Sequence, residues 1–375
     1  MSFRKNVFVL GAGFSVDAGA PVMREFFTQA RNLRDDPSSG LNTTDREIFD
    51  RVINYRFGLN QALAKVFVDL DNIEKLFGFL EMDLQLRSST DQKLKHDMPY
   101  FIARTLEAGM TKQLPPECGV VAEGADGRRW DFRFAKNRYA FFLGIVSGLW
   151  NPKKRNSDSS IDSVITFNYD LVIEREMPDL GIAPEYGLGV GCSTEFPGAT
   201  LRLNLLKMHG SSNWLICSTC KDRIYIRSPL KAKVWLIANE MCPRCNQVSM
   251  VPYIIPPTWN KGIEGGFVHP VWERALQELM TAGRLFIVGY SFPETDQFFE
   301  YMLGLALSTN KALTEIYVVN SSEKVQEKFK EFFNPHFHSR TVHGGPVKAF
   351  DLISSLPTLT GQTFEEKNFG TMFTR

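Results

Sequence analysis

The sequence predicts an α/β protein with a Rossmann-like parallel sheet that carries helices on both faces, a four-cysteine ribbon module and a large helical insertion. Three observations favour this fold. Short apolar runs end abruptly in polar residues and are separated by helical or irregular chain, as in parallel strands that are covered on both faces. A glycine-rich turn follows the first of these runs, and two Cys-x-x-Cys pairs lie between later ones.

The first strand is predicted at Asn6–Leu10, and the turn 11-GAGFS-15 follows it directly. Residues 15–33 then have helical apolar spacing. Glycines at a strand-to-helix turn let the backbone approach a phosphate, and the first N–H groups of a helix carry positive partial charge. Position 16 is Val, so the stretch is not a full Gly-x-Gly-x-x-Gly, and an ordinary tight turn is the alternative.

Residues from about 40 to 150 have helical spacing and many aromatic side chains, without a strong strand signal. The spacing is clearest at Ile73, Leu76, Phe77, Leu80 and Leu84. The polar stretch 151–160 ends this region and has the composition of a linker. We therefore expect a helical insertion at 40–159 between two parts of the sheet domain, 1–39 and 160–375.

Four later runs are predicted as strands, within 163–170, 203–214, 284–296 and 315–320. In parallel α/β sheets, ligands bind at the carboxyl ends of the strands. Here those ends are small or polar, at positions 11–15, 168–170, 209–210, 289–291 and 320. We expect these residues to converge on one edge of the sheet.

Four of the six cysteines form the pairs 217-CSTC-220 and 242-CPRC-245, with positions 221 to 241 between them. This spacing is typical of a four-thiolate tetrahedral zinc site, which is closed to substrate and therefore structural. We expect Cys217, Cys220, Cys242 and Cys245 to bind zinc in a ribbon module at 211–250. A redox role for either pair is the alternative.

Three polar residues at the predicted sheet edge could carry chemistry. His209 could accept a proton near neutral pH, although a lone His is more often structural. Asn168 could orient a water or a ribose hydroxyl, but it cannot act as a base. Asp170 could accept hydrogen bonds from a carboxamide, or it could cap a helix.

The composition sets limits on the partners. Lys and Arg together number 43 and Asp and Glu 42, so no global field would draw the chain to nucleic acid or to an anionic membrane. The longest apolar helix candidate, 139–150, is too short to span a bilayer, which takes about 18 residues or more. The apolar run after Arg4 and Lys5 stops at Gly11 and is too short for a secretion signal. We expect a cytoplasmic protein without direct nucleic-acid binding.

Taken in order, the motifs resemble those of the sirtuin superfamily. They are Gly-Ala-Gly-Phe-Ser-x-x-x-Gly-Ala-Pro-x-x-Arg, Thr-Phe-Asn-Tyr-Asp, His-Gly, the four-cysteine ribbon, Gly-Tyr-Ser and a strand that ends in Asn. More closely, the chain is similar to bacterial sirtuin-like proteins of antiphage defence, which consume NAD. The resemblance covers residues 6–33 and about 160–330, and the region from about 40 to 150 lies outside it.

The resemblance implies how NAD⁺ would bind. Its pyrophosphate would contact Gly11, Ala12, Gly13 and Ser15. Its adenosine half would contact Gly289, Ser291 and Asn320. Asp170 would bind the carboxamide, and Arg24 falls where sirtuins have the Arg of a cofactor-binding loop.

The catalytic roles implied by the resemblance fall on two residues. Asn168 would orient the nicotinamide ribose or a water, and His209 would act as general base. Departures from the family pattern bear on the reaction: Val22 and Met23 replace Asp-Phe, Phe167 replaces Gln, and 251–260 replaces the strand on which sirtuins lay an acyl-lysine peptide. Without an acyl-lysine the nucleophile would be water.

We therefore expect an NAD⁺ glycohydrolase that releases nicotinamide and ADP-ribose and depletes NAD in antiphage defence. The alternatives are an NAD-dependent protein deacylase, a non-catalytic subunit that senses NAD or ADP-ribose, and, more weakly, transfer of ADP-ribose to a protein. Such an activity needs restraint, so the resemblance also implies a homo-oligomer, or a partner such as a HerA-type ATPase or another defence protein, with contacts through the helical insertion.

Overall fold

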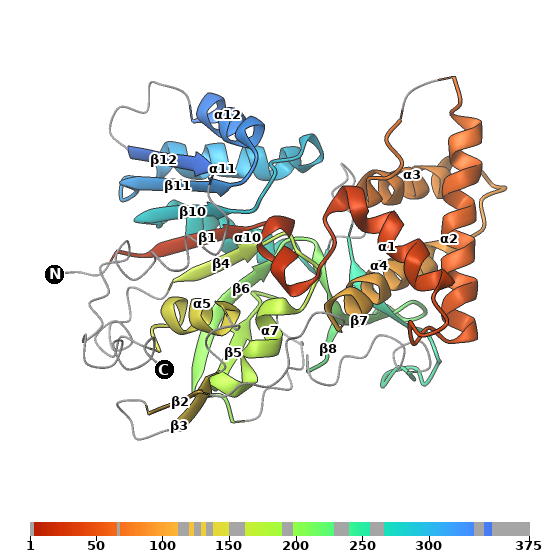
Figure 1. Cartoon of the computed structure of the whole chain (residues 1–375), viewed down its shortest axis with the longest axis horizontal. Coiled ribbons are helices and arrows are strands. Elements are labelled where there is room, and N and C mark those ends of the chain that lie inside the picture. Colours follow the sequence, from red (N-terminus) through yellow and green to blue (C-terminus); the bar gives the residue numbers. More distant parts are fainter. Residues whose placement is uncertain are drawn as a thin grey trace.

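The computed structural model describes residues 4–65, 68–111, 120–123, 129–132, 138–149, 162–189, 198–228, 240–255, 266–333 and 341–346. A seven-stranded sheet, parallel throughout, has the order β12-β11-β10-β1-β4-β6-β5 (Figure 1). Its strands are β1 Asn6–Leu10, β4 Ser163–Thr166, β5 Ile182–Glu185, β6 Leu201–Lys207, β10 Arg284–Val288, β11 Glu315–Asn320 and β12 Thr341–Pro346. The predicted parallel sheet is confirmed.

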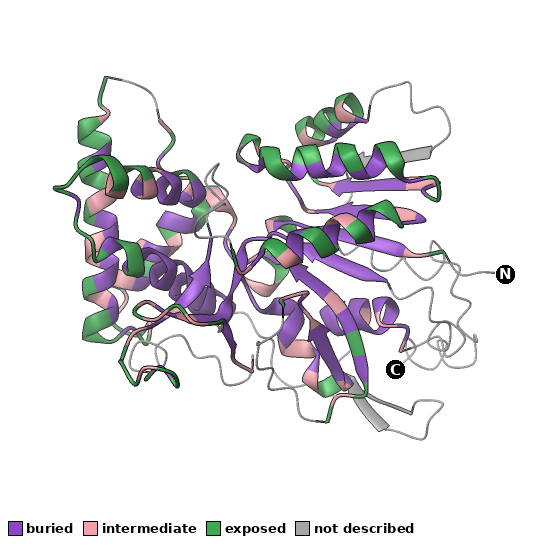
Figure 2. Cartoon of the chain, turned by 180° about the vertical axis from the view of Figure 1, so that it is seen from behind, coloured by how far each residue is buried: buried purple, intermediate pink, exposed green. Residues whose placement is uncertain are grey.

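Helices cover both faces of this sheet. Figures 1 and 2 show α5 (Arg138–Val146) and α7 (Val172–Glu176) on one face, and α10 (His269–Met280) and α11 (Gln297–Thr309) on the other. Another helix, α12 (Glu323–Phe332), packs against β11 and β12. Every residue of β1 is buried, which is why the strand is continuously apolar from Val7 to Leu10 instead of alternating, while the buried Asn6 at its start is hydrogen-bonded to Asp162.

Aromatic side chains tie the central strands together. Phe8 of β1, Phe286 of β10 and Tyr317 of β11 are register partners, and their rings stack in sequence with centroids 4.7 Å apart at each step. Phe142 of α5 meets the Phe8 ring edge-on at 5.3 Å. Aromatic pairs contribute about 0.5–1.5 kcal/mol beyond the area that they bury, so this row stabilises the middle of the sheet.

The chain reverses direction across the sheet at one place. After β1 it builds β4, β5 and β6 on one side, and it then crosses to β10, β11 and β12 on the other side of β1. The carboxyl ends of β1 and β10 therefore flank the topological switch point, where α/β sheets bind ligands.

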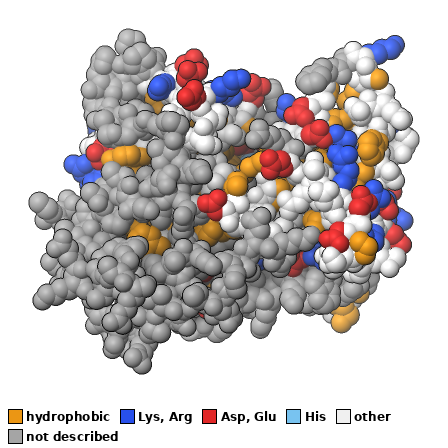
Figure 3. Space-filling model, in the orientation of Figure 1, with side chains coloured by type: hydrophobic (Ala, Val, Ile, Leu, Met, Phe, Trp, Pro, Cys, Tyr) orange, Lys and Arg blue, Asp and Glu red, His pale blue; other side chains and the backbone are white. Residues whose placement is uncertain are grey.

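Four helices lie beside the sheet (Figure 1): α1 Phe26–Asp35, which precedes the insertion, and α2 Thr43–Ala62, α3 Ile73–Leu86 and α4 Leu94–Thr111, which belong to it. Asn42 and Asp45 form a capping box at the start of α2, and the Asn72 side chain caps α3. Among the described helices, none is both long and apolar enough to cross a membrane. On the described surface of this region in Figure 3, acidic and basic side chains are interspersed.

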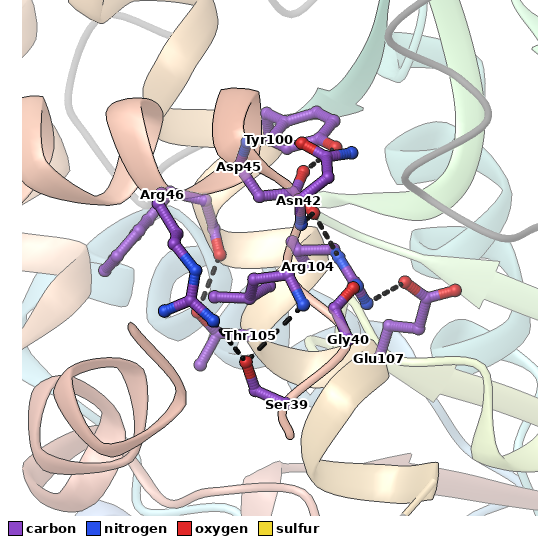
Figure 4. A network of polar contacts seen from close by, with 11 residues as sticks. Ser39, Gly40, Asn42, Asp45, Arg46, Tyr100, Arg104, Thr105 and Glu107 are labelled. Carbon is purple, nitrogen blue, oxygen red and sulfur yellow. Dashed lines mark hydrogen bonds and ion pairs between the residues drawn. The ribbon is translucent and has the colours of Figure 1, made fainter. Parts of the chain in front are cut away.

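A polar network joins the helices of the insertion (Figure 4). Arg104 of α4 contacts Asp45 of α2 at 3.4 Å, Glu107 at 2.8 Å and the carbonyl oxygen of Gly40 at 2.7 Å. The hydroxyl of Tyr100 donates to Asp45 at 2.5 Å. Asp45 and Arg104 are 0% and 5% exposed, so these contacts offset the cost of burying both charges.

The cysteine module is a small antiparallel sheet with the order β8-β7-β9, formed by β7 Gly210–Cys217, β8 Tyr225–Ile226 and β9 Met250–Ile254. The module follows β6 directly, since only Met208 and His209 separate the end of β6 from the start of β7. Gly210 has φ +81°, and a Cβ there would lie 2.1 Å from the Tyr253 carbonyl oxygen. Only glycine fits this junction between the two sheets.

Three parts of the fold differ from the sequence prediction. The helix predicted at 15–33 begins only at Phe26, because the chain first makes three short 3₁₀ turns. Gly19, which has a left-handed backbone, and Pro21, which lacks an N–H, prevent a continuous helix. The insertion also contains a hairpin, β2 Val120–Glu123 and β3 Arg129–Phe132, in runs rich in β-branched and aromatic residues. β5 and β12 were not predicted, and the helix-like stretch 347–356 lies outside the described residues.

Candidate active site

The glycine-rich turn after β1 packs against the turn after β10. The N–H of Gly11 donates to Val288 at 3.0 Å and that of Gly13 to Gly289 at 2.9 Å. A Cβ at Gly11 would lie 2.4 Å from the Tyr290 Cα, and one at Gly13 would lie 2.9 Å from the Gly289 Cα. Close packing of the two turns thus explains these glycines without a ligand. This agrees with the alternative that the stretch is an ordinary tight turn.

Helix-start donors were expected to face a phosphate at this turn, but the local structure is different. The N–H of Phe14 donates to Gly11 at 2.9 Å, and that of Ser15 to Ala12 at 3.0 Å. Since the turn continues into short 3₁₀ segments, no α-helix starts directly behind it. Contacts of Gly11, Ala12, Gly13 and Ser15 with a pyrophosphate stay a prediction.

Asn168 joins the end of β4 to this turn. Its side-chain N–H groups donate to the Gly11 carbonyl oxygen at 2.9 Å and to the buried Ser15 hydroxyl at 3.0 Å. Its own backbone N–H donates to Thr166 Oγ1 at 3.1 Å, which fixes the start of the loop. Because both amide hydrogens are used in this way, the Asn168 side chain can offer a ligand only its oxygen.

Asp170 has the capping role that was one of its two predicted alternatives. One carboxylate oxygen accepts a hydrogen bond from the Val172 N–H at 3.1 Å, at the start of α7. The Asp170 carbonyl oxygen accepts from the Lys207 ammonium at 2.5 Å, and Lys207 also pairs with Glu174 at 2.7 Å. Burial raises the pKa of Glu174, and Lys207 partly offsets this. A buried ion pair thus holds the Asp170 loop.

Asn168 and Asp170 border a partly open cavity of about 30 Å³. A cavity of this size has room for about one or two water molecules. Apolar residues of three helices line the same cavity: Phe26 of α1, which precedes the insertion, and Ile73 of α3 with Ile102 and Leu106 of α4, which belong to it. The insertion therefore completes a pocket whose polar groups come from the sheet edge.

His209 is buried apart from this cavity, at 1% exposure. Its ring meets Phe167 edge-on at 5.2 Å and lies 6.2 Å from both Tyr169 and Trp272. Its Nε2 atom is 3.4 Å from a carboxylate oxygen of the equally buried Asp296. Its carbonyl oxygen accepts from the Ile255 N–H at 2.9 Å, so the ribbon also fixes its backbone.

The residues expected to contact adenosine lie at the ends of β10 and β11. Ser291 is exposed, whereas the Asn320 side chain is engaged within the protein. It donates to the Tyr290 carbonyl oxygen at 3.1 Å and accepts from the Ser322 N–H at 3.0 Å. The backbone of Arg24 lies in the 3₁₀ segment Met23–Glu25, and its side chain lies outside the described part. The adenosine contacts and the role of Arg24 stay predictions.

The four predicted cysteines come together at the tip of the ribbon. All four sulfur atoms lie within 4.8 Å of one another, which suits a tetrahedral zinc ion. The residue after each pair, Lys221 or Asn246, has positive φ, +47° and +58°, so each pair ends in a tight turn. Burial disfavours the Cys217 thiolate, but N–H groups and the Ser249 hydroxyl hydrogen-bond to it and lower its pKa to about 5. The cluster can therefore hold a metal through thiolate ligands.

Sequence reasoning missed several residues of this region. Asp296 lies beside His209 and accepts a hydrogen bond from Tyr290, and Lys207 with Glu174 holds the loop after β4. The acid in 289-GYSFPETD-296, a few positions after a predicted strand end, was an available signal. No pattern in the sequence indicated that the insertion would line the cavity, since that depends on how α3 and α4 pack.

No protein-family model matches the chain, and no curated protein matches its sequence. Solved structures align over 96% of its length. One is a structure with the description "Structural Basis for the Mechanism and Regulation of Sir2 Enzymes". It is 14% identical in sequence, the alignment covers 93% of its chain, and the TM-score is 0.41. Another is Sir2 with the inhibitor EX-527, 2′-O-acetyl-ADP-ribose and a deacetylated p53 peptide, with 13% identity, 95% of that chain covered and a TM-score of 0.39. Sir2Af2 bound to a myristoylated histone peptide aligns with 13% identity, 94% of that chain covered and a TM-score of 0.37. Because these TM-scores are below 0.5, the site rests on the contacts described above.

Proposed function

We propose that the chain is an NAD⁺ glycohydrolase with a sirtuin-like site. The observation that carries the proposal is the position of Asn168, whose amide hydrogens fasten the glycine-rich turn while its oxygen stays available beside Asp170 and the cavity. This juxtaposition of a glycine turn, an amide oxygen and a carboxylate lies at the carboxyl ends of β1 and β4. The ordered motifs that resemble sirtuins supply the substrate, NAD⁺.

The reaction needs few groups. The bond between C1′ of the ribose and the nicotinamide nitrogen breaks, and nicotinamide leaves as a neutral molecule with the electron pair. A water forms the new C1′–O bond and gives up a proton. Asn168 would orient the ribose or this water, and His209 would take the proton. Such general-base catalysis raises the rate by about 10²–10⁴-fold. The products are nicotinamide and ADP-ribose.

The fit of the substrate sets a condition on this function. A cavity of about 30 Å³ is smaller than a nicotinamide ring, and His209 does not line it. NAD⁺ binding therefore requires displacement of residues 20–26 or of α3 and α4, which form the apolar wall. Access of His209 to the attacking water also requires movement of the Phe167 and Tyr169 rings, which line the cavity and lie against His209. Such a requirement agrees with an enzyme that must stay silent until it is triggered.

The role of the four cysteines is structural in this proposal. Zinc bound by four thiolates has no open position for a substrate, so it would stabilise the ribbon without entering the reaction. A function in antiphage defence, a homo-oligomer and a HerA-type ATPase partner are implied only by the resemblance, and they remain predictions.

Nicotinamide release from NAD⁺ by the purified protein tests the proposal. Wild type is compared with Asn168→Ala and His209→Ala, with and without an acetyl-lysine peptide. Matched controls are Asn60→Ala on the exposed side of α2 and His269→Ala, whose side chain is 72% exposed. Peptide-independent release that both site variants abolish, and both controls retain, supports hydrolysis.

Other outcomes select the alternatives. Release only with the peptide would make the protein a deacylase. Tight NAD⁺ or ADP-ribose binding without release, under every condition including added partner proteins, would favour a sensing subunit. Transfer of labelled ADP-ribose to protein would identify an ADP-ribosyltransferase.

A further inference from the structure

A buried carboxylate faces the candidate base. Asp296 is 2% exposed, and one of its oxygens lies 3.4 Å from His209 Nε2. Its other oxygen accepts a hydrogen bond of 2.6 Å from the Tyr290 hydroxyl. The 3.4 Å separation is an ion-pair distance and longer than a good hydrogen bond. Three side chains therefore form one contiguous row: Tyr290 and Asp296 from the connection between β10 and α11, and His209 from the connection between β6 and β7.

The rest of the environment makes this row stand out. The aromatic rings of Phe167, Tyr169 and Trp272 also lie near His209. Burial and the Asp296 charge raise the pKa of Tyr290 well above its usual value, and burial does the same for Tyr169. Both phenols therefore stay neutral over the working pH range. Asp296 is thus the acidic side chain that faces the imidazole within this set of contacts.

A charge in such a place has a direct effect on a neighbouring imidazole. A carboxylate next to Nε2 accepts the hydrogen on that nitrogen and leaves the lone pair on Nδ1. It also stabilises the imidazolium that forms when Nδ1 takes a proton, as the acid of a Ser-His-Asp triad does. The low local dielectric strengthens this interaction, since water is excluded from both groups.

We propose that Asp296 is a positioning residue for His209, and that Tyr290 in turn fixes Asp296. This rests on the proposed function, in which His209 takes a proton from the attacking water. The proton moves from water to Nδ1, the Nε2–H stays directed at Asp296, and the carboxylate remains ionised throughout. Asp296 does not touch the substrate.

Kinetics of nicotinamide release provide one test. Asp296→Asn keeps the size of the side chain but removes the charge, so kcat should fall by about 10²-fold or more while KM for NAD⁺ changes little. Tyr290→Phe keeps the ring that stacks on Phe167 at 4.5 Å and should lower kcat only several-fold. Asp179→Asn makes the same chemical change at an exposed position and should leave kcat unchanged.

A double variant separates positioning from a merely structural role. If Asp296 acts through His209, then Asp296→Asn has no further effect on the residual rate of His209→Ala. An equal loss in both backgrounds, or an unchanged kcat in the single variant, would overturn the proposal. Thermal unfolding of each variant identifies those that fail to fold.

A measurement without turnover keeps the test independent of the proposed function. The imidazole of His209 can be titrated by NMR, with His209→Ala used to assign its signal. Its pKa should be lower in Asp296→Asn than in wild type, because the stabilising charge is gone. An unchanged pKa of His209 would contradict the positioning role of Asp296, whether or not wild type releases nicotinamide. Absence of nicotinamide release, without that result, would count only against the glycohydrolase.

Discussion

Gly109 of α4 lies directly against Gly19, four residues after the glycine-rich turn: a Cβ on Gly109 would lie 2.9 Å from the Gly19 carbonyl oxygen. The same Cβ would lie 2.1 Å from Nε2 of Gln29, a flexible side chain that can move away. The contact with the Gly19 backbone cannot be relieved so easily. The helical insertion is thus packed onto the chain that directly follows the glycine-rich turn of the candidate site.

Gly109→Ala should therefore destabilise the protein although Ala is the better helix former. Overpacking of this kind costs about 1–3 kcal/mol, and it should also change NAD⁺ turnover by displacing α4. The control is Gly58→Ala in α2, where a Cβ meets nothing within 4 Å. The free energy of unfolding of Gly58→Ala should be higher than that of wild type by about 0.5–1 kcal/mol. Urea unfolding measures both, and equal effects would contradict the packing argument.

Asn168→Asp should impair both folding and activity. The carboxylate cannot donate to the Gly11 carbonyl oxygen or to Ser15, and it places negative charge beside that carbonyl. Leaving such partners unsatisfied costs about 1–3 kcal/mol of unfolding free energy. Ser15→Ala removes only one of the two acceptors and should cost less. Thermal unfolding and nicotinamide release are measured on the same samples, and a fully stable Asn168→Asp would refute the bridging role.

The cysteine cluster should contain one zinc ion per chain. Cys245→Ser should lose the metal and lower the melting temperature, because a structural zinc site contributes its binding free energy to folding. Cys192→Ser makes the same change at a cysteine that belongs to neither Cys-x-x-Cys pair and should keep the metal. Elemental analysis and thermal unfolding with and without a chelator give the result. A metal-free wild type of unchanged stability would leave the redox alternative.

Glu174 should make stability depend on pH. Burial raises its folded pKa above the ordinary value of 4.5, so the folded chain holds this proton more tightly than the unfolded chain. Its favourable contribution is therefore complete below about pH 4.5 and is lost as the pH rises through the folded pKa. Glu174→Gln should remove this decline in unfolding free energy.

The measurement for Glu174 is urea unfolding at a series of pH values from 4 upward. Glu327→Gln on the exposed side of α12 controls for the loss of one carboxylate. Parallel pH profiles for wild type and Glu174→Gln would show that Lys207 compensates fully for the burial.

The sheet could be predicted from the sequence because each central strand is a continuous apolar run, as in β1 and β10. β5 was missed because 182-IAPE-185 is short and contains Pro184, which is unusual inside a strand. The helix predicted at 15–33 is wrong over 15–25 for a related reason: the prediction relied on apolar spacing, whereas Gly19 and Pro21 determine the backbone there.

The candidate site shows the same division. The convergence of Asn168 and Asp170 with the glycine turn followed from strand ends alone, because parallel strands share one edge. The burial of His209 beneath Phe167 and the contact with Asp296 depend on side-chain packing between distant loops. Patterns within a single segment carry no information about such contacts.

The network around Arg104 has a mechanical consequence for the cavity. It binds α4 to the start of α2 and to the Gly40 backbone, and Arg46 of α2 reaches back to the carbonyl oxygen of Asp36 at the end of α1. A bending of α4 alone would break several buried contacts at once. Space for a larger molecule is therefore easier to obtain if the helices swing as one rigid body, with the irregular chain around Gly19 as the pivot.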